Sequence, residues 1–132
     1  MSEPRTILVV DDDPEIRDLT AAVLNGAGYA ALTCSGGRDA LRRLDAGRVD
    51  LVLLDINMPE MDGWETLRLL RADEALAGLP VVMFSVKGEI SDKVHSLQEG
   101  ATAYITKPFV VDELIARIER VLAAAQAPMG RR

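Results

Sequence analysis

The chain has 132 residues, 48% hydrophobic and 27% charged, which is the size and composition of one soluble globular domain with its own core. The net charge of -6 disfavours a nucleic-acid-binding surface, and no apolar stretch is long enough to cross a membrane. The single cysteine, Cys34, has no partner for an internal disulfide, and the N-terminus lacks the layout of a signal peptide, so we expect a cytoplasmic protein.

The first strand and helix are marked by an apolar run and by the residues that follow it. Thr6–Val10 is the apolar run and predicts a strand. Asp13 then offers a helix cap and Pro14 a first helical residue, and the amphipathic stretch that follows is stopped by Gly26 and Gly28. The opening of the chain therefore reads as a strand followed by a helix.

The middle of the chain contains its most buried-looking strand. Tyr29–Thr33 predicts a short second strand, and Gly37–Ala46 predicts a helix with a narrow apolar stripe. Leu51–Leu54 are four apolar residues without alternation, so both faces of this third strand must be covered, as in a parallel sheet between helices. Asp55 follows at once, and the turn residues between 58 and 63 predict an irregular loop before the next helix.

The second half continues the alternation of strands and helices. We expect a helix from Gly63 to about Arg71, a strand Val81–Phe84, a helix Glu89–Glu99, a strand Ala103–Thr106 and a helix ending near Ala125. Five such units imply an α/β fold, a doubly wound parallel sheet with helices on both faces in three layers. We expect one domain over residues 1–125 and a flexible tail over residues 126–132.

Polar residues stand at the carboxyl ends of four predicted strands. Asp11 and Asp12 follow the first, Asp55 the third, Ser85 the fourth and Lys107 the fifth. A parallel sheet brings these ends to one edge, where three carboxylates repel unless a cation lies among them. Oxygen ligands favour Mg²⁺, or Mn²⁺ as a substitute. With a lysine and a hydroxyl to hold phosphoryl oxygens, the pattern indicates phosphoryl transfer to a carboxylate nucleophile.

These motifs resemble a known family over essentially the whole chain. VVDDDP, LLDINMPEMDG, VVMFS and the stretch from Gly100-Ala101 to Lys107-Pro108-Phe109 are similar to the receiver domain of bacterial two-component response regulators, including the single-domain chemotaxis type. The resemblance implies a flavodoxin-like fold with five strands in the order 2-1-3-4-5 and five helices. It also implies a cis peptide bond before Pro108.

The resemblance assigns roles to the acidic residues. Asp55 is similar to the phosphoacceptor, which takes a phosphoryl group from the phosphohistidine of a histidine kinase or phosphotransfer protein. Asp12 matches a direct Mg²⁺ ligand, Asp11 an acidic residue acting through water, and Asn57 the position whose backbone carbonyl completes the metal site. Such a domain catalyses only its own phosphorylation and dephosphorylation and is otherwise not an enzyme.

The resemblance also implies a switch and an output surface. Ser85 corresponds to the hydroxyl that moves toward the phosphoryl group, Lys107 to the invariant cation, and Tyr104 to the aromatic that turns inward. The face formed by helix four, strand five and helix five would then bind a downstream effector protein, with no direct contact to nucleic acid or membrane. The chain would be a monomer or a phosphorylation-induced dimer, either standing alone or cut from a longer regulator.

Simpler and rival interpretations remain open at this stage. Taken singly, an aspartate after a strand is often only a helix cap, and a serine or lysine there is often a turn residue or a solvated charge. Asp11-x-Asp13 also resembles the first motif of haloacid-dehalogenase-like phosphatases, although no acidic pair follows a strand downstream of Lys107. The other rival is a pseudo-receiver, an interaction module that is never phosphorylated.

One departure from the family pattern predicts a slow loss of the phosphoryl group. Receivers usually carry a small residue after the hydroxyl position, whereas this chain has Val86, whose branched side chain would shield an acyl phosphate from water. Lys87 faces the same route and is a second modulating residue. Val86→Ala is expected to shorten the phosphoryl lifetime, measured by decay of the labelled protein, and an unchanged lifetime would refute the shielding role.

Overall fold

The computed structural model describes residues 3–85, 95 and 97–126. Its strands are β1 (Thr6–Val10), β2 (Ala30–Cys34), β3 (Leu51–Asp55), β4 (Val81–Ser85) and β5 (Ala103–Thr106). Its helices are α1 (Pro14–Gly26), α2 (Gly37–Ala46), α3 (Gly63–Ala72) and α5 (Val111–Gln126). None of the helices described is both long and apolar enough to span a membrane.

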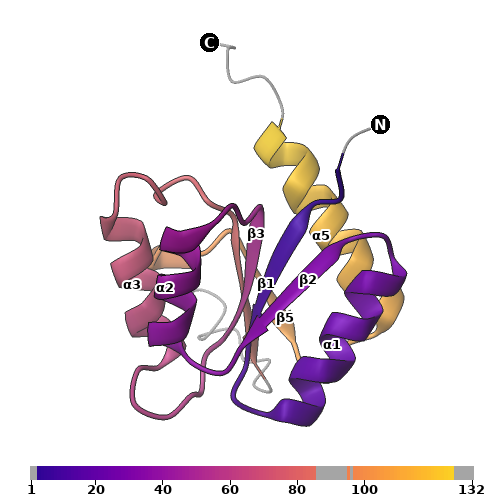
Figure 1. Cartoon of the computed structure of the whole chain (residues 1–132), viewed down its shortest axis with the longest axis horizontal. Coiled ribbons are helices and arrows are strands. Elements are labelled where there is room, and N and C mark those ends of the chain that lie inside the picture. The colour runs from indigo at the N-terminus through magenta and orange to yellow at the C-terminus, as the bar shows by residue number, and fades with distance from the viewer. Residues whose placement is uncertain (1–2, 86–94, 96, 127–132) are drawn as a thin grey trace.

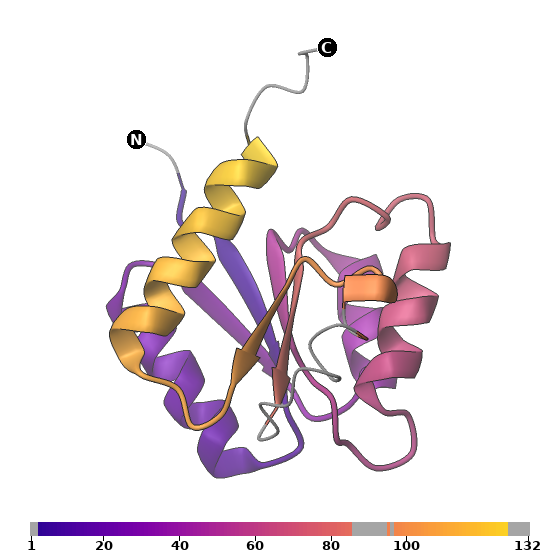
Figure 2. The same cartoon turned by 180° about the vertical axis from the view of Figure 1, so that it is seen from behind.

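The strands form one parallel sheet with helices on both faces. The strand order is β2-β1-β3-β4-β5, which confirms the predicted doubly wound flavodoxin-like topology. Helices α2 and α3 lie on one face and α1 and α5 on the other (Figures 1 and 2). Alternate residues of the buried strands serve the two layers: Leu8 packs with Leu67 beneath α3, whereas Ile7 packs with Ile118 beneath α5. Both faces of β1 and β3 are therefore covered, as their unbroken hydrophobicity predicted.

Element boundaries differ from the predictions by a few residues, each for a local reason. Strand β2 begins at Ala30 because the amide of Tyr29 donates to the Leu24 carbonyl and so belongs to the end of α1. Asp55 and Ser85 are the last residues of their strands because they still pair, Asp55 with Phe84 and Ser85 with Thr106. Helix α5 begins at residue 111 and extends to residue 126, one residue into the predicted tail.

Two other expectations concern the second half of the chain. The cis peptide bond between Lys107 and Pro108 is confirmed. Most of the helix predicted at Glu89–Glu99 lies outside the described residues, although His95 and Leu97 are helical.

Two aspartate caps fix where helices leave the carboxyl edge of the sheet. Asp13 Oδ1 accepts from the Glu15 amide at 3.0 Å with Pro14 at the first helical position, as predicted. Asp62 Oδ1 accepts from the Glu65 amide at 3.0 Å and starts α3. Helix α1 begins directly after Asp11 and Asp12, which follow β1, whereas the loop 56–62 separates Asp55 from the start of α3.

Gly63 brings the first turn of α3 against the end of β3. Its amide donates to the Ile56 carbonyl at 2.8 Å. A Cβ at this position would overlap the Asp55 carbonyl oxygen and lie 2.7 Å from the Ile56 Cα. The close approach involves backbone on both sides, so neither partner can move aside without displacing the strand or the helix.

Gly63→Ala is therefore expected to lower the free energy of unfolding by about 1–3 kcal/mol, because the added methyl group overpacks against backbone. Gly78→Ala is the matched control, since a Cβ there meets nothing within 4 Å. Urea unfolding of both variants checks this, and equal stabilities would show that α3 is not held at van der Waals contact with β3.

Candidate functional site

Three carboxylates meet where adjacent strands end. Asp11 and Asp12 follow β1, and Asp55 is the last residue of β3, the neighbour of β1 in the sheet. Their carboxylate oxygens lie within 4.8 Å of one another. Asp11 is 0% and Asp55 4% exposed, whereas Asp12 is exposed, so the acidic cluster opens toward solvent on the side of Asp12. The sheet therefore gathers the three residues, as the strand-end pattern predicted.

Lys107 supplies the positive charge of the site although it follows β5, two strands away from β3. Its Nζ lies 2.7 Å from Asp11 Oδ2 and 3.4 Å from Asp55 Oδ1, with the side chain only 6% exposed. The lysine passes the end of β4, where its ammonium lies 4.9 Å from the centre of the Phe84 ring. A cation over an aromatic face is attracted by the ring's quadrupole, so Phe84 supports the ammonium.

Phe84 is the site residue that sequence reasoning missed, because it was assigned only to the core. Its side chain has no acidic, basic or nucleophilic group, so its residue type did not indicate a role in the site. Its position did indicate one, because Phe84 precedes Ser85 and pairs with Asp55 across the β3–β4 ladder. Given the strand order, that register places Phe84 on the strand that a lysine following β5 must pass to reach Asp55.

The remaining predicted residues lie around this centre. Ser85 is buried at the end of β4, and its carbonyl accepts from the Lys107 amide at 2.6 Å. Asn57 is exposed in the loop two residues beyond β3. Tyr104 is buried in β5 and packs in the core layer beneath α2 and α3. Val86 and Lys87 lie outside the described residues.

The two oxygens of the Asp11 carboxylate have separate partners. Oδ1 accepts from the Asp13 amide at 3.0 Å, and Oδ2 accepts from Lys107 Nζ at 2.7 Å. The Asp11 carbonyl also accepts from Nη1 of Arg17 at 3.1 Å, which ties the end of β1 to α1. Both oxygens of Asp11 are thus engaged, whereas Asp12 is the exposed carboxylate of the cluster.

The electrostatics of the site leave excess negative charge. The pKa of the Asp55 carboxyl is raised to about 6; burial is the largest cause, Lys107 lowers the pKa, and Asp11 and Asp12 raise it. When ionised, the three carboxylates and one ammonium that the described residues contribute leave two negative charges. A cluster of oxygen donors with this charge and an open side fits a hard divalent cation.

The fold and the cluster agree with the comparisons with known proteins. The family model of the response regulator receiver domain matches residues 7–119. This chain is a member of the response regulator receiver domain family. The match confirms the resemblance and the predicted signalling class, and it favours neither the phosphatase nor the pseudo-receiver alternative.

Individual relatives show the extent of the likeness. The phosphate regulon transcriptional regulatory protein PhoB of Pseudomonas aeruginosa is 41% identical over 118 residues, which are 89% of this chain and 52% of PhoB. The receiver domain thus spans about half the length of the curated relatives it matches. The structure of the chemotaxis protein CheY4 of Vibrio cholerae has a TM-score of 0.85 at 31% identity, covering 89% of this chain and 98% of CheY4.

A third relative carries a metal ion. The receiver domain of the sensor histidine kinase PA1611 from Pseudomonas aeruginosa has a TM-score of 0.84 at 29% identity. The alignment covers 91% of this chain and 98% of that domain, whose structure has a magnesium ion coordinated in its active-site cleft.

The raised pKa of Asp55 gives this receiver domain a testable pH dependence. Because the folded-state pKa, about 6, lies above the ordinary value of 3.8, the folded state binds this proton more tightly than the unfolded state. The contribution of Asp55 to stability therefore falls as pH rises from about 4 to about 6, and its ionised form is destabilising at neutral pH.

Asp55→Asn is expected to raise the free energy of unfolding at pH 7.5 in EDTA by roughly 1–3 kcal/mol, because the amide resembles the neutral carboxyl. The gain should disappear below about pH 4, where Asp55 is protonated in both states. Asp13→Asn is the control, since asparagine also caps helices well. Chemical unfolding across this pH range measures both variants, and a destabilised Asp55→Asn protein would contradict the electrostatic account.

Proposed function

We propose that Asp55 is the phosphoacceptor of this receiver domain and takes a phosphoryl group from the phosphohistidine of a histidine kinase or phosphotransfer protein. The observation that carries the proposal is the position of Asp55 between acidic neighbours and a buried lysine. The lysine ammonium lies 3.4 Å from Asp55 Oδ1, and the Asp12 side of the cluster is open to solvent. A carboxylate beside an ammonium at an open strand end can meet an incoming phosphoryl group.

In the proposed reaction, an Asp55 carboxylate oxygen attacks phosphorus while the bond from phosphorus to the histidine nitrogen breaks. That nitrogen takes a proton as it leaves, and an aspartyl phosphate results. Lys107 lies where it can contact an equatorial oxygen of the transferring group, because its Nζ already reaches both Asp11 and Asp55. The hydroxyl of Ser85, at the neighbouring strand end, would donate a hydrogen bond to an oxygen of the bound phosphoryl group.

We further propose that Asp12 and Asp55 bind Mg²⁺ directly, with Mn²⁺ as a substitute. Asp11, whose oxygens are engaged by the Asp13 amide and Lys107, would act through water. The Asn57 backbone carbonyl is the remaining proposed ligand, from the loop beyond β3. The all-oxygen donor set, its two excess negative charges and its open side support this assignment. The cation would neutralise charge on the phosphoryl oxygens.

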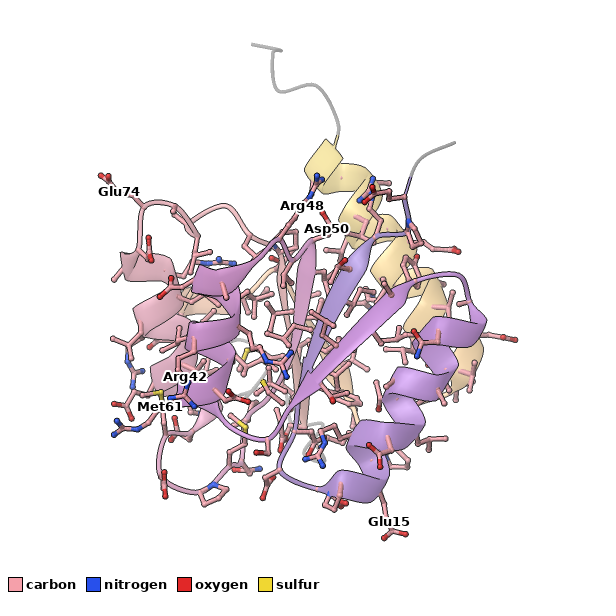
Figure 3. The ribbon with its side chains drawn as sticks, viewed as in Figure 1. Glu15, Arg42, Arg48, Asp50, Met61 and Glu74 are labelled. Carbon is pink, nitrogen blue, oxygen red and sulfur yellow. The ribbon has the colours of Figure 1, made fainter. Side chains whose placement is uncertain are left out.

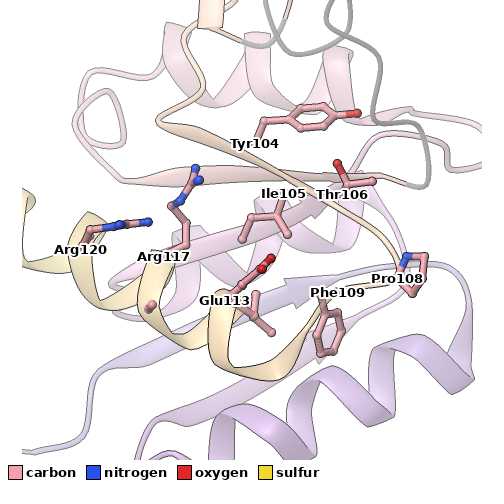
Figure 4. Close-up of a pocket in the computed structure, with 10 residues that line it drawn as sticks. Tyr104, Ile105, Thr106, Pro108, Phe109, Glu113, Arg117 and Arg120 are labelled. Carbon is pink, nitrogen blue, oxygen red and sulfur yellow. The ribbon is translucent and has the colours of Figure 1, made fainter.

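The proposed output surface includes the groove between β5 and α5. A pocket of about 590 Å³ lies there, with Tyr104 and Phe109 among its lining residues together with Arg117 and Arg120 (Figure 4). Strand β5 leads from Tyr104 directly to Lys107, so a displacement of Lys107 would also displace the β5 residues that line this groove. We propose that an effector protein, or a further domain of a longer regulator, contacts this face when Asp55 is phosphorylated.

Covalent labelling tests the phosphoacceptor. Incubation with acetyl phosphate and Mg²⁺ is expected to add one phosphoryl group to the wild-type protein, seen by intact mass, and none to Asp55→Asn. Asp13→Asn is the control, because Asp13 caps α1. If Asp11→Asn abolishes labelling while Asp55→Asn retains it, the phosphatase-like assignment replaces this one.

Metal binding has a separate test that does not use phosphoryl transfer. Mg²⁺ at about one hundred times its Kd is expected to raise the free energy of unfolding of the wild-type protein by about 2.7 kcal/mol. Asp12→Asn should reduce this gain strongly, because Asp12 is the exposed carboxylate of the cluster, and Asp13→Asn should keep it. Equal Mg²⁺ responses in the two variants would remove Asp12 from the ligand set.

A further inference from the structure

Arg71, at the end of α3, binds three backbone carbonyls from two different turns. Its Nε donates to the Gly100 carbonyl at 2.8 Å, and its Nη1 donates to the carbonyls of Leu79 at 2.8 Å and Leu76 at 3.4 Å. The guanidinium is partly buried, and burial lowers its pKa from the ordinary value. The contacts described for Arg71 include no carboxylate, so its partly buried charge is compensated by the three carbonyl oxygens.

The bound carbonyls lie at the entries of the two strands that end at the functional site. Leu79 lies two residues before β4, whose last residue is Ser85. Gly100 lies three residues before β5, which leads to Lys107. Arg71 therefore joins the starts of β4 and β5, and the far ends of these strands carry the hydroxyl and the ammonium of the site.

The helix that carries Arg71 is itself fixed to a third strand. Gly63, the first residue of α3, lies against the backbone of Asp55 and Ile56 at the end of β3. Helix α3 thus spans the sheet from the carboxyl edge to the amino edge. Figure 3 shows the two edges: Glu15 lies at the carboxyl edge, and Glu74, in the loop just after α3, lies toward the opposite edge with Arg48 and Asp50.

The surroundings of Arg71 are shaped for an arginine. Gly100 has a φ of +103°, and a Cβ there would lie 3.3 Å from the Arg71 side chain, so glycine leaves room for the guanidinium. Thr102 reinforces the same join, because its amide donates to the Val81 carbonyl at 2.7 Å and its hydroxyl accepts from the Val81 amide at 3.1 Å. A lysine has one nitrogen and cannot reproduce the planar fork that reaches both turns.

We propose that Arg71 is a positioning residue for the phosphoryl-binding half of the site. By joining the entries of β4 and β5 on a helix anchored to β3, it sets where Ser85 and Lys107 lie relative to Asp55. The strands are rigid elements of roughly 15 Å, so a shift at their entries reaches their ends. This inference rests on the proposed function where it is tested by beryllium fluoride binding. A second measurement, hydrogen exchange, does not depend on that function.

The test compares Arg71→Gln with Arg71→Lys and with Arg68→Gln as a matched control. Arg68 lies on the same helix, and its contact with Glu99 is a 3.6 Å ion pair with the arginine side chain 53% exposed. Affinity for Mg²⁺ alone and affinity for beryllium fluoride with saturating Mg²⁺ are measured where urea titration shows each variant to be folded. The Mg²⁺ affinity depends on the carboxylates at the ends of β1 and β3. The beryllium fluoride affinity also depends on Ser85 and Lys107.

In Arg71→Gln the affinity for beryllium fluoride is expected to fall about five- to tenfold, since small displacements of positioning groups are costly. Its Mg²⁺ affinity should stay within about twofold of wild type, and Arg71→Lys should recover only part of the loss. Arg68→Gln should match wild type in both. A beryllium fluoride affinity in Arg71→Gln equal to that of Arg68→Gln, or an equal loss of Mg²⁺ affinity, overturns the inference.

Hydrogen exchange separates this inference from the proposed function. The Lys107 amide, which donates to the Ser85 carbonyl at 2.6 Å, is expected to exchange faster in Arg71→Gln than in Arg68→Gln. If the wild-type protein binds no beryllium fluoride, the proposed function fails, and this comparison alone decides the role of Arg71. Equal exchange rates in the two variants would show that the contacts of Arg71 at the starts of β4 and β5 do not affect the structure at the carboxyl ends of these strands.

Discussion

The buried contact of Lys107 with Asp11 and Asp55 is the interaction on which the rest of the site depends. An ammonium taken out of water is stabilised only when oppositely charged groups lie close and are well placed. Here two carboxylates lie at 2.7 and 3.4 Å from Nζ, and the Phe84 ring lies at 4.9 Å. These partners come from β1, β3 and β4, and the lysine follows β5, so one charge joins four of the five strands at their carboxyl ends.

The same contact leaves an acidic cluster whose carboxylates could hold a further cation. Lys107 neutralises one charge of three, and the pKa of Asp55 remains raised because burial and the other carboxylates outweigh the ammonium. Asp11 is held by backbone and lysine, while Asp12 stays exposed on the open side. The folded protein thus keeps an unfavourable concentration of negative charge at one edge, an arrangement typical of sites whose ligand supplies the missing positive charge.

Much of this arrangement could be predicted from the sequence because a parallel sheet carries strand-end residues to one edge whatever the order of its strands. Asp11, Asp12, Asp55 and Lys107 were predicted to lie together on that ground, and a helix from about Gly37 to Ala46 was predicted where α2 lies. What patterning could not supply was the strand order, which came from the family resemblance. Without that order, nothing indicates that Lys107 must pass over the end of β4 and contact Phe84.

Two other features, the assignment of Tyr29 and the contacts of Arg71, could not be predicted from the sequence for similar reasons. Tyr29 is a residue type that favours strands, yet it belongs to the end of α1. Its assignment depends on which carbonyl accepts its amide, and that carbonyl is Leu24. Arg71 was predicted only as the approximate end of a helix, and its three carbonyl partners come from turns 5 to 29 residues away. Its role depends on tertiary structure, since those turns meet only after β4 and β5 have paired.

The most direct test of the account is a crystal structure of the protein with Mg²⁺ and beryllium fluoride. The account predicts beryllium bonded to an Asp55 carboxylate oxygen, one fluoride in contact with Lys107 Nζ and another with the Ser85 hydroxyl, and the metal ion between Asp12 and Asp55. Beryllium fluoride bound elsewhere, or a metal ion that does not contact these carboxylates, would contradict the central claim that the strand ends form one phosphoryl-accepting site.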